Sequence, residues 1–162
     1  MTTIAGTFLA LIMIFGAAQV NVSGQENDSD QKASKSIVGV WETVVTVRNC
    51  ETGGPLAPEF QGLSTYNSGG TYTETASGNP ILRSPAHGIW ERENGWRNYS
   101  LKFAFLRFNS SGVLIGKQRV FQTIELSENG DQLTSSGRFE VLDLSGNVIG
   151  SGCSTATATR FK

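Results

Sequence analysis

Apolar and polar residues alternate along most of the chain after residue 37, and no stretch there has the spacing of an amphipathic helix. Alternation with a period of two is typical of β-strands that bury one face. Glycine-containing turns separate the alternating segments. We therefore predict eight strands, over residues 38–49, 60–66, 71–76, 87–92, 99–108, 113–126, 132–142 and 148–161.

The connections between these strands fall into two groups. Residues 67–70, 94–95 and 129–130 are compact turns of Asn, Ser and Gly, and Asn and Gly tolerate a positive φ. The other group includes two long loops, 51–59 and 77–86, together with 109–112 and 144–147. Alternate connections lie at the same end of an up-and-down barrel. The fold class is therefore predicted to be all-β, a single eight-stranded antiparallel up-and-down barrel with one tight end and one open mouth.

The N-terminal residues have the pattern of an export signal. An apolar run at 8–15 is followed by small residues, which predicts a cleaved signal peptide over residues 1–24. A membrane anchor is the alternative, but a span needs about 20 strongly apolar residues and this stretch is diluted by Gly, Thr and Gln. Residues 25–36 carry no apolar side chain larger than Ala, which predicts a disordered leader. The barrel domain is then 37–162, in a secreted or periplasmic protein.

Charge and composition narrow the possible partners. The formal net charge is −1, which gives no general field that attracts nucleic acid or an anionic membrane. We therefore expect no nucleic-acid partner, and no membrane association after signal cleavage. The two cysteines and single histidine cannot make a four-ligand zinc site, so no metal and no cofactor are expected.

The first and last strands carry residues that can close the barrel. If they pair, Trp41 and Arg160 meet, and the guanidinium can lie on the indole face as a structural contact. Cys50 and Cys153 lie on the same two segments, and two cysteines in an oxidising compartment favour one disulfide. Opposite residues in an antiparallel pair have a constant sum, which is 203 for the cysteines and 201 for the Trp–Arg pair. The two registers agree to within one diagonal step.

The pair of Gly39-x-Trp41 near the start and Arg160 near the end resembles the shared signature of the calycin superfamily. Lipocalins, fatty-acid-binding proteins and avidins belong to it, and the resemblance implies a lipocalin-like barrel. Residues 70–73 and 84–88 resemble avidin's third strand and the segment that follows it, which implies a polar ligand contact for Tyr72. Thr43 and Val47 depart from the avidin pattern, so the resemblance implies the shared fold without the biotin specificity.

The leading functional prediction is a non-enzymatic protein that carries a small apolar or aromatic ligand in the lumen. A lumen filled by side chains is the competing possibility, because eight-stranded barrels occur in both forms. We expect inward residues to border the ligand, namely Thr43, Val45, Val47, Tyr72, Trp90, Tyr99, Phe103, Phe105 and Phe121.

Two further functions stay open. One is a protein-binding or inhibitory barrel that acts through loops 51–59 and 77–86. The other is a cyclase or isomerase of the allene-oxide-cyclase-like barrel type. Glu74 and His87 are candidates for the rim, and a His87–Glu74 pair inside a cavity would favour the enzyme.

Overall fold

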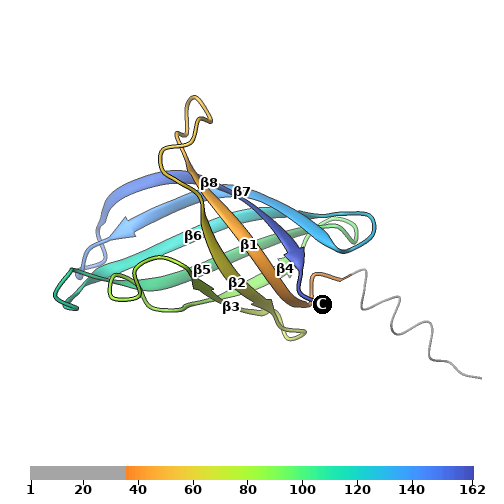
Figure 1. Ribbon diagram of the computed structural model, residues 1–162, viewed down its shortest axis with the longest axis horizontal. Helices are drawn as coiled ribbons and strands as arrows, with labels where there is room; N and C mark the ends of the chain where they lie inside the picture. The colour runs from red at the N-terminus through yellow and green to blue at the C-terminus, as the bar shows by residue number, and fades with distance from the viewer. Residues whose placement is uncertain (1–35) are drawn as a thin grey trace, which may run out of the picture.

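The computed structural model describes residues 36–162, which form a closed β-barrel (Figure 1). All eight predicted strands are present, and their ends differ from the predicted ones by at most one residue. They are β1 (Gly39–Arg48), β2 (Phe60–Tyr66), β3 (Thr71–Ala76), β4 (Ala86–Arg92), β5 (Asn98–Phe108), β6 (Leu114–Leu126), β7 (Gln132–Leu142) and β8 (Val148–Arg160).

Each strand pairs antiparallel with the next, and β1 pairs with β8 to close the sheet. The predicted all-β up-and-down topology is therefore confirmed, and it is consistent with a calycin-like fold. Closure removes the exposed strand edges that an open sheet would present to other chains. The predicted signal peptide 1–24 lies outside the described residues, as does the leader 25–36 except for its last residue. Within residues 36–162 no helix has the length and apolarity to cross a membrane.

The register between β1 and β8 follows the Trp–Arg pair. Trp41 lies opposite Arg160, and the same register continues to Arg48 opposite Cys153. The disulfide between Cys50 and Cys153 is confirmed. Cys50 is not directly opposite its partner, however, because it follows the end of β1 and lies two residues beyond Arg48. The bond spans 103 positions of the sequence. In the chain-entropy model a loop of that size stabilises the fold by about 4–5 kcal/mol.

Arg160 and Trp41 join the first and last strands at the closed end of the barrel. The guanidinium carbon lies 4.3 Å from the centre of the indole ring. The guanidinium donates hydrogen bonds of 2.6 to 3.0 Å to the backbone carbonyls of Ser36, Val38 and Gly130. The indole Nε1 donates to the carbonyl of Ile37 at 2.9 Å. One side chain thus ties the entry to β1, the end of β8 and the β6–β7 turn together.

The closed half of the barrel is filled by side chains. Its core is a single cluster of buried residues that includes the two largest fully buried side chains, Trp41 and Tyr99. The other members are Ile37, Tyr66, Tyr72, Leu101, Ile124, Leu126, Leu133 and Ala158, with Trp90 and Phe103 packed against them. This end also carries the compact turns, so little chain is needed to seal it.

Removal of the closing contact should unfold the barrel more easily. Trp41→Ala should lower the free energy of unfolding by about 3–5 kcal/mol, because it truncates a large, fully buried side chain. Arg160→Ala should lower it by about 2 kcal/mol or more, since charge-assisted hydrogen bonds to three carbonyls are lost. Urea denaturation measures both. The control is Trp96→Ala, which truncates an exposed tryptophan. If all three variants unfolded at the same urea concentration, the structural role of the pair would be refuted.

Candidate functional site

A cavity of about 340 Å³ occupies the open half of the barrel. Tyr66, Tyr72 and Leu133 belong both to its lining and to the core cluster, so they form its floor. Above this floor the wall is made by inward residues of every strand except β4. The barrel is therefore neither wholly filled nor wholly open. It is filled at one end and hollow at the other.

The hollow half exists because many of its inward positions carry small residues. Ser154 and Ala156 of β8 and Ser135 of β7 line the cavity. Glycines at 62, 88, 137 and 152 occupy further inward positions by strand alternation. A Cβ atom at 152 would overlap the ring of Phe139, and one at 88 would overlap Phe103. Gly152 therefore lets the phenyl ring of Phe139 lie against the wall, and Gly88 lets β4 and β5 approach closely at Lys102 and Phe103.

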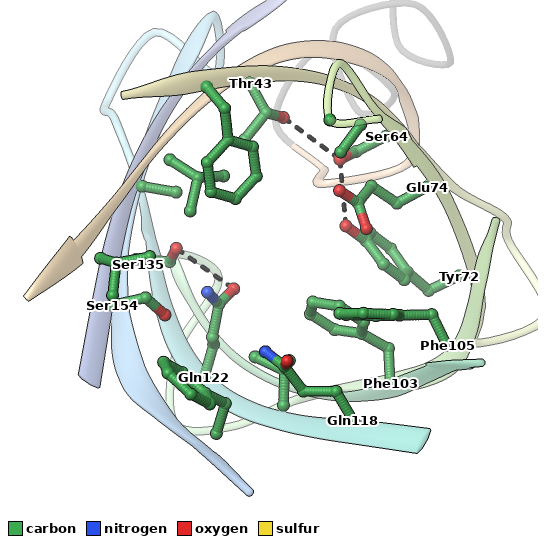
Figure 2. A pocket seen from close by; sticks show the side chains of 18 of the residues that line it. Thr43, Ser64, Tyr72, Glu74, Phe103, Phe105, Gln118, Gln122, Ser135 and Ser154 are labelled. Atoms are coloured by element: carbon green, nitrogen blue, oxygen red, sulfur yellow. Dashed lines mark hydrogen bonds between the residues drawn. The ribbon is translucent and has the colours of Figure 1, made fainter. Parts of the chain in front are cut away.

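Three hydroxyl groups form a chain along one side of the cavity (Figure 2). The Oγ atoms of Thr43 and Ser64 lie 3.1 Å apart, and Ser64 Oγ lies 3.0 Å from the hydroxyl of Tyr72. The residues come from β1, β2 and β3, which are neighbours in the sheet. A hydroxyl can both donate and accept, so this chain can reorient its protons to meet either kind of polar ligand atom.

A buried ion pair lies nearer the mouth. Arg83, from the β3–β4 connection, contacts Glu74 of β3 with 2.9 Å between Nη2 and Oε2. Both are largely buried, and the guanidinium also covers the ring of Phe105 with 3.9 Å to its centre. Among the described residues that line the cavity, these two are the charged ones. Their charges cancel, so the cavity as a whole is neutral.

The opposite wall combines amides with aromatic rings. Gln118 and Gln122 of β6 extend into the cavity from the side facing the hydroxyl chain, and Ser135 Oγ donates to Gln122 Oε1 at 3.3 Å (Figure 2). Phe103 and Phe105 lie beside Tyr72, and the rings of Tyr72 and Phe103 are 5.2 Å apart. The cavity thus offers flat apolar surfaces with a few polar groups at fixed places.

The structure brings most of the predicted lumen residues together. The cavity is lined by Thr43, Val45, Val47, Tyr72, Phe103 and Phe105. Glu74, predicted for the rim, also faces inward and lines the cavity. Two predicted residues lie elsewhere: Trp90 and Tyr99 pack in or against the closed-half core, with ring centres 5.7 Å apart.

Phe121 was placed wrongly in the lumen. In β6 the buried positions are Gly116, Val120, Ile124 and Leu126, all even-numbered, so by alternation Phe121 faces outward. Its ring lies 5.4 Å from the guanidinium of Arg138 on the next strand.

His87 does not pair with Glu74. It is exposed on β4, where the neighbouring inward position is the buried Ala86. Glu74 lies opposite Ala86 in the β3–β4 register and is bound by Arg83 instead. The arrangement that would favour a cyclase or isomerase is therefore not found in the described part of the chain.

Five polar lining residues are not among the predicted ones: Ser64, Arg83, Gln118, Gln122 and Ser135. Four of them share strand parity with residues that are clearly inward, such as Tyr66, Val120 and Leu133, so alternation could have revealed them. Arg83 lies in a loop, and no periodic signal points to it.

A search of the chain against protein-family models finds no matching family, and a comparison with curated proteins finds no match.

Burial raises the pKa of both floor tyrosines. For Tyr66 the further causes are the nearby Tyr72 and Glu74, and for Tyr72 the further cause is the Glu74 carboxylate. The hydrogen bond to Ser64 lowers the pKa of Tyr72 and offsets only part of this rise. Both hydroxyls therefore stay protonated through the physiological range and remain available as hydrogen-bond donors.

The raised tyrosine pKa values should make the barrel sensitive to alkali. A tyrosine in the unfolded chain ionises at a pKa of about 10, below its folded pKa, so the unfolded state loses the proton first. The stabilising contribution of each buried, protonated tyrosine to the free energy of unfolding is fully present below pH about 10. It is lost as the pH rises towards the folded pKa. The slope is about 1.4 kcal/mol per pH unit for each tyrosine. Urea unfolding across this range should show a shallower decline for Tyr72→Phe than for the wild type. Parallel curves would contradict the account.

Proposed function

We propose that this protein is a secreted, non-enzymatic carrier of the calycin type, which holds a small apolar or aromatic molecule in the open half of its barrel. The observation that carries the proposal is the cavity of about 340 Å³, in which aromatic walls surround a short chain of hydroxyl groups. Ligand sites in proteins generally combine a mostly apolar concavity of at least about 300 Å³ with a few placed polar groups.

The lining sets the chemistry of the ligand. Its apolar body would lie between the phenyl rings of Phe103 and Phe105 and the aliphatic side chains of Val45 and Val47. A single polar group would reach the hydroxyls of Ser64 and Tyr72 near the floor. Because Glu74 and Arg83 neutralise each other, a charged ligand would find no unpaired partner there, and burial of an unpaired charge is costly. We therefore favour a neutral molecule.

Export of the protein is supported by two features. The N-terminal residues have the composition of a signal peptide, and the disulfide between Cys50 and Cys153 is of the kind that persists in oxidising compartments. A carrier outside the cytoplasm would meet its ligand in dilute solution or at a surface. A cavity that is formed before the ligand arrives would suit that task.

The protein-binding alternative has less support from the site. The 77–86 loop is held against the cavity mouth by Arg83, which contacts both Glu74 and Phe105. Its main-chain atoms also bond to β5, since Ser84 N donates to Leu106 O at 3.0 Å and Phe108 N donates to Leu82 O at 2.9 Å. This loop therefore acts as part of the cavity wall. Of the two loops considered for a protein partner, the β1–β2 loop is the one that extends away from the barrel (Figure 1).

The carrier proposal is tested by titration with a neutral, environment-sensitive dye, followed by competition with neutral aromatic compounds and, as the charged comparison, fatty acids. Dye fluorescence and calorimetry are the readouts, since no tryptophan lines the cavity within the described residues. We expect at least one compound to bind in the low micromolar range. Binding should show a negative heat-capacity change, the mark of buried apolar surface.

The matched variants are Ala156→Phe and Thr157→Phe. These residues are neighbours on β8, but Ala156 is buried and lines the cavity, while Thr157 is exposed on the outer face. Ala156→Phe should lower affinity by about tenfold or more by filling the cavity, and Thr157→Phe should leave it unchanged. If nothing binds below the high micromolar range, or if both variants bind like the wild type, the carrier proposal fails.

A further inference from the structure

Six exposed aliphatic side chains gather on the connections at the open end of the barrel, and we call them the aliphatic rim. They are Ile81, Leu82, Val113, Leu144, Val148 and Ile149, with exposed fractions between 43 and 69 %. They come from the β3–β4, β5–β6 and β7–β8 connections and the start of β8. Single exposed aliphatic residues are ordinary, but a group on three connections at one end of a molecule marks an interaction surface.

The three connections lie side by side. Phe108 N, at the end of β5, donates to Leu82 O at 2.9 Å, and Phe108 lies opposite Leu114 at the start of β6. On the other side, the end of β7 lies opposite the start of β8, with Leu142 paired with Val148. In Figure 1 the same connections meet at one end of the barrel, while the β1–β2 loop projects away from them. The rim is therefore one surface and not a set of scattered residues.

The composition of the rim favours lipid over protein as the occupant. Protein interfaces draw most of their binding energy from Trp, Tyr and Arg, and Leu and Val are under-represented among their hot spots. The rim consists of Leu, Ile and Val, and the exposed tryptophan of the domain, Trp96, lies beside the β4–β5 turn at the other end. Aliphatic side chains on loop tips can enter the acyl region of a leaflet without a partner of complementary shape.

The charges beside the rim complement an anionic surface. Arg107 and Lys117 lie near it on β5 and β6, and neither takes part in an ion pair within residues 36–162. The nearby acidic residue is Asp143, whose carboxylate accepts two hydrogen bonds from Asn147. The Arg119–Glu140 and Arg83–Glu74 pairs are neutral. The charged residues beside the rim that lack an ion-pair partner within residues 36–162 are thus Arg107, Lys117 and Asp143, an excess of one positive charge. Glu51 and Glu59 lie on the β1–β2 loop, which projects away from the rim (Figure 1).

We propose that the aliphatic rim docks the barrel, open end first, on a phospholipid leaflet that contains anionic lipid. This proposal departs from the expectation of no membrane association, which was drawn from the net charge of the whole chain. The charge beside the rim differs from that average. The docking does not rest on the carrier function. If both hold, the cavity mouth faces the leaflet, because Arg83 lines the cavity and directly follows Leu82 of the rim.

The test is co-sedimentation of the exported protein with vesicles of equimolar phosphatidylglycerol and phosphatidylcholine, and with vesicles of phosphatidylcholine alone. The rim variant is Val113→Ser/Leu144→Ser/Ile149→Ser. The matched control is Val40→Ser/Leu63→Ser/Ile89→Ser, which removes aliphatic side chains on the barrel wall that are 41 to 53 % exposed. The rim variant should lower the partition coefficient by about tenfold or more. The control should bind like the wild type.

Two further variants separate the apolar and electrostatic contributions. Arg107→Gln/Lys117→Gln should remove most of the preference for phosphatidylglycerol, and added salt should do the same to the wild type. Leu144→Trp should give a blue-shifted emission with vesicles that brominated lipids quench. Vesicles should leave the emission of the native tryptophans unchanged, because Trp41 and Trp90 lie in or against the closed-half core and Trp96 is at that end. The difference between the variant and the wild type therefore reports Leu144→Trp.

Three results would overturn the proposal. One is equal vesicle binding by the rim variant and the wall control, and another is no binding to either vesicle. The third is self-association in sedimentation velocity that the rim variant abolishes, without vesicle binding, which would make the rim an interface between two copies. Dye titration without vesicles reports the carrier function separately, so each proposal can fail alone.

Discussion

The contact between Trp41 and Arg160 is the constraint on which the rest of the barrel depends. It joins the first strand to the last, and it places the guanidinium 4.3 Å from the indole ring while three backbone carbonyls hold its nitrogens. A closed sheet has a single consistent register, and a slip of one residue would exchange its inner and outer faces. Because the contact fixes the register of β1 against β8, it also determines which residues of those strands face the lumen.

The division of the lumen follows from residue size at those inward positions. Large side chains such as Trp41, Tyr66 and Tyr99 meet near the compact turns and fill that half. Towards the other end, the inward positions carry Gly, Ala and Ser among the aromatic rings, and these are too small to meet across the barrel. Protein interiors normally pack to crystal-like density. A cavity of this size is therefore an exception, and ligand binding would account for it. The disulfide holds β1 and β8 together near the open end, which the packed core of the other half does not reach.

Much of this arrangement was accessible from the sequence. Alternation and turn residues predicted every strand, and Thr43, Val45 and Val47 were correctly expected to face inward. The two cysteines and their register correctly predicted the disulfide. Prediction failed where two adjacent apolar residues leave the inward face of a strand ambiguous, and in loops, where residues do not alternate. In β6 both Val120 and Phe121 are apolar, and the larger residue was wrongly assigned to the lumen.

Other features depend on information that a period-two pattern does not contain. Trp90 was expected at the ligand, but its height along the barrel axis places it against the closed-half core. Arg83 reaches Glu74 from a loop across a separation of nine residues, and only the folded path of that loop brings them together. Whether the lumen was filled or hollow could not be decided from composition, because it depends on where along the axis the small residues coincide.

The central claim is that one half of the lumen is packed and the other can accept a small apolar molecule. The most direct measurement is methyl NMR of the protein under xenon pressure, since xenon enters apolar cavities without needing a specific ligand. The account predicts xenon-dependent shifts at the methyl groups of Val45, Val47 and Val120, which line the cavity, and unchanged signals for Ile124 and Leu126 in the packed half. Unchanged signals at all five residues would contradict it, because they would mean that the open half is filled as well.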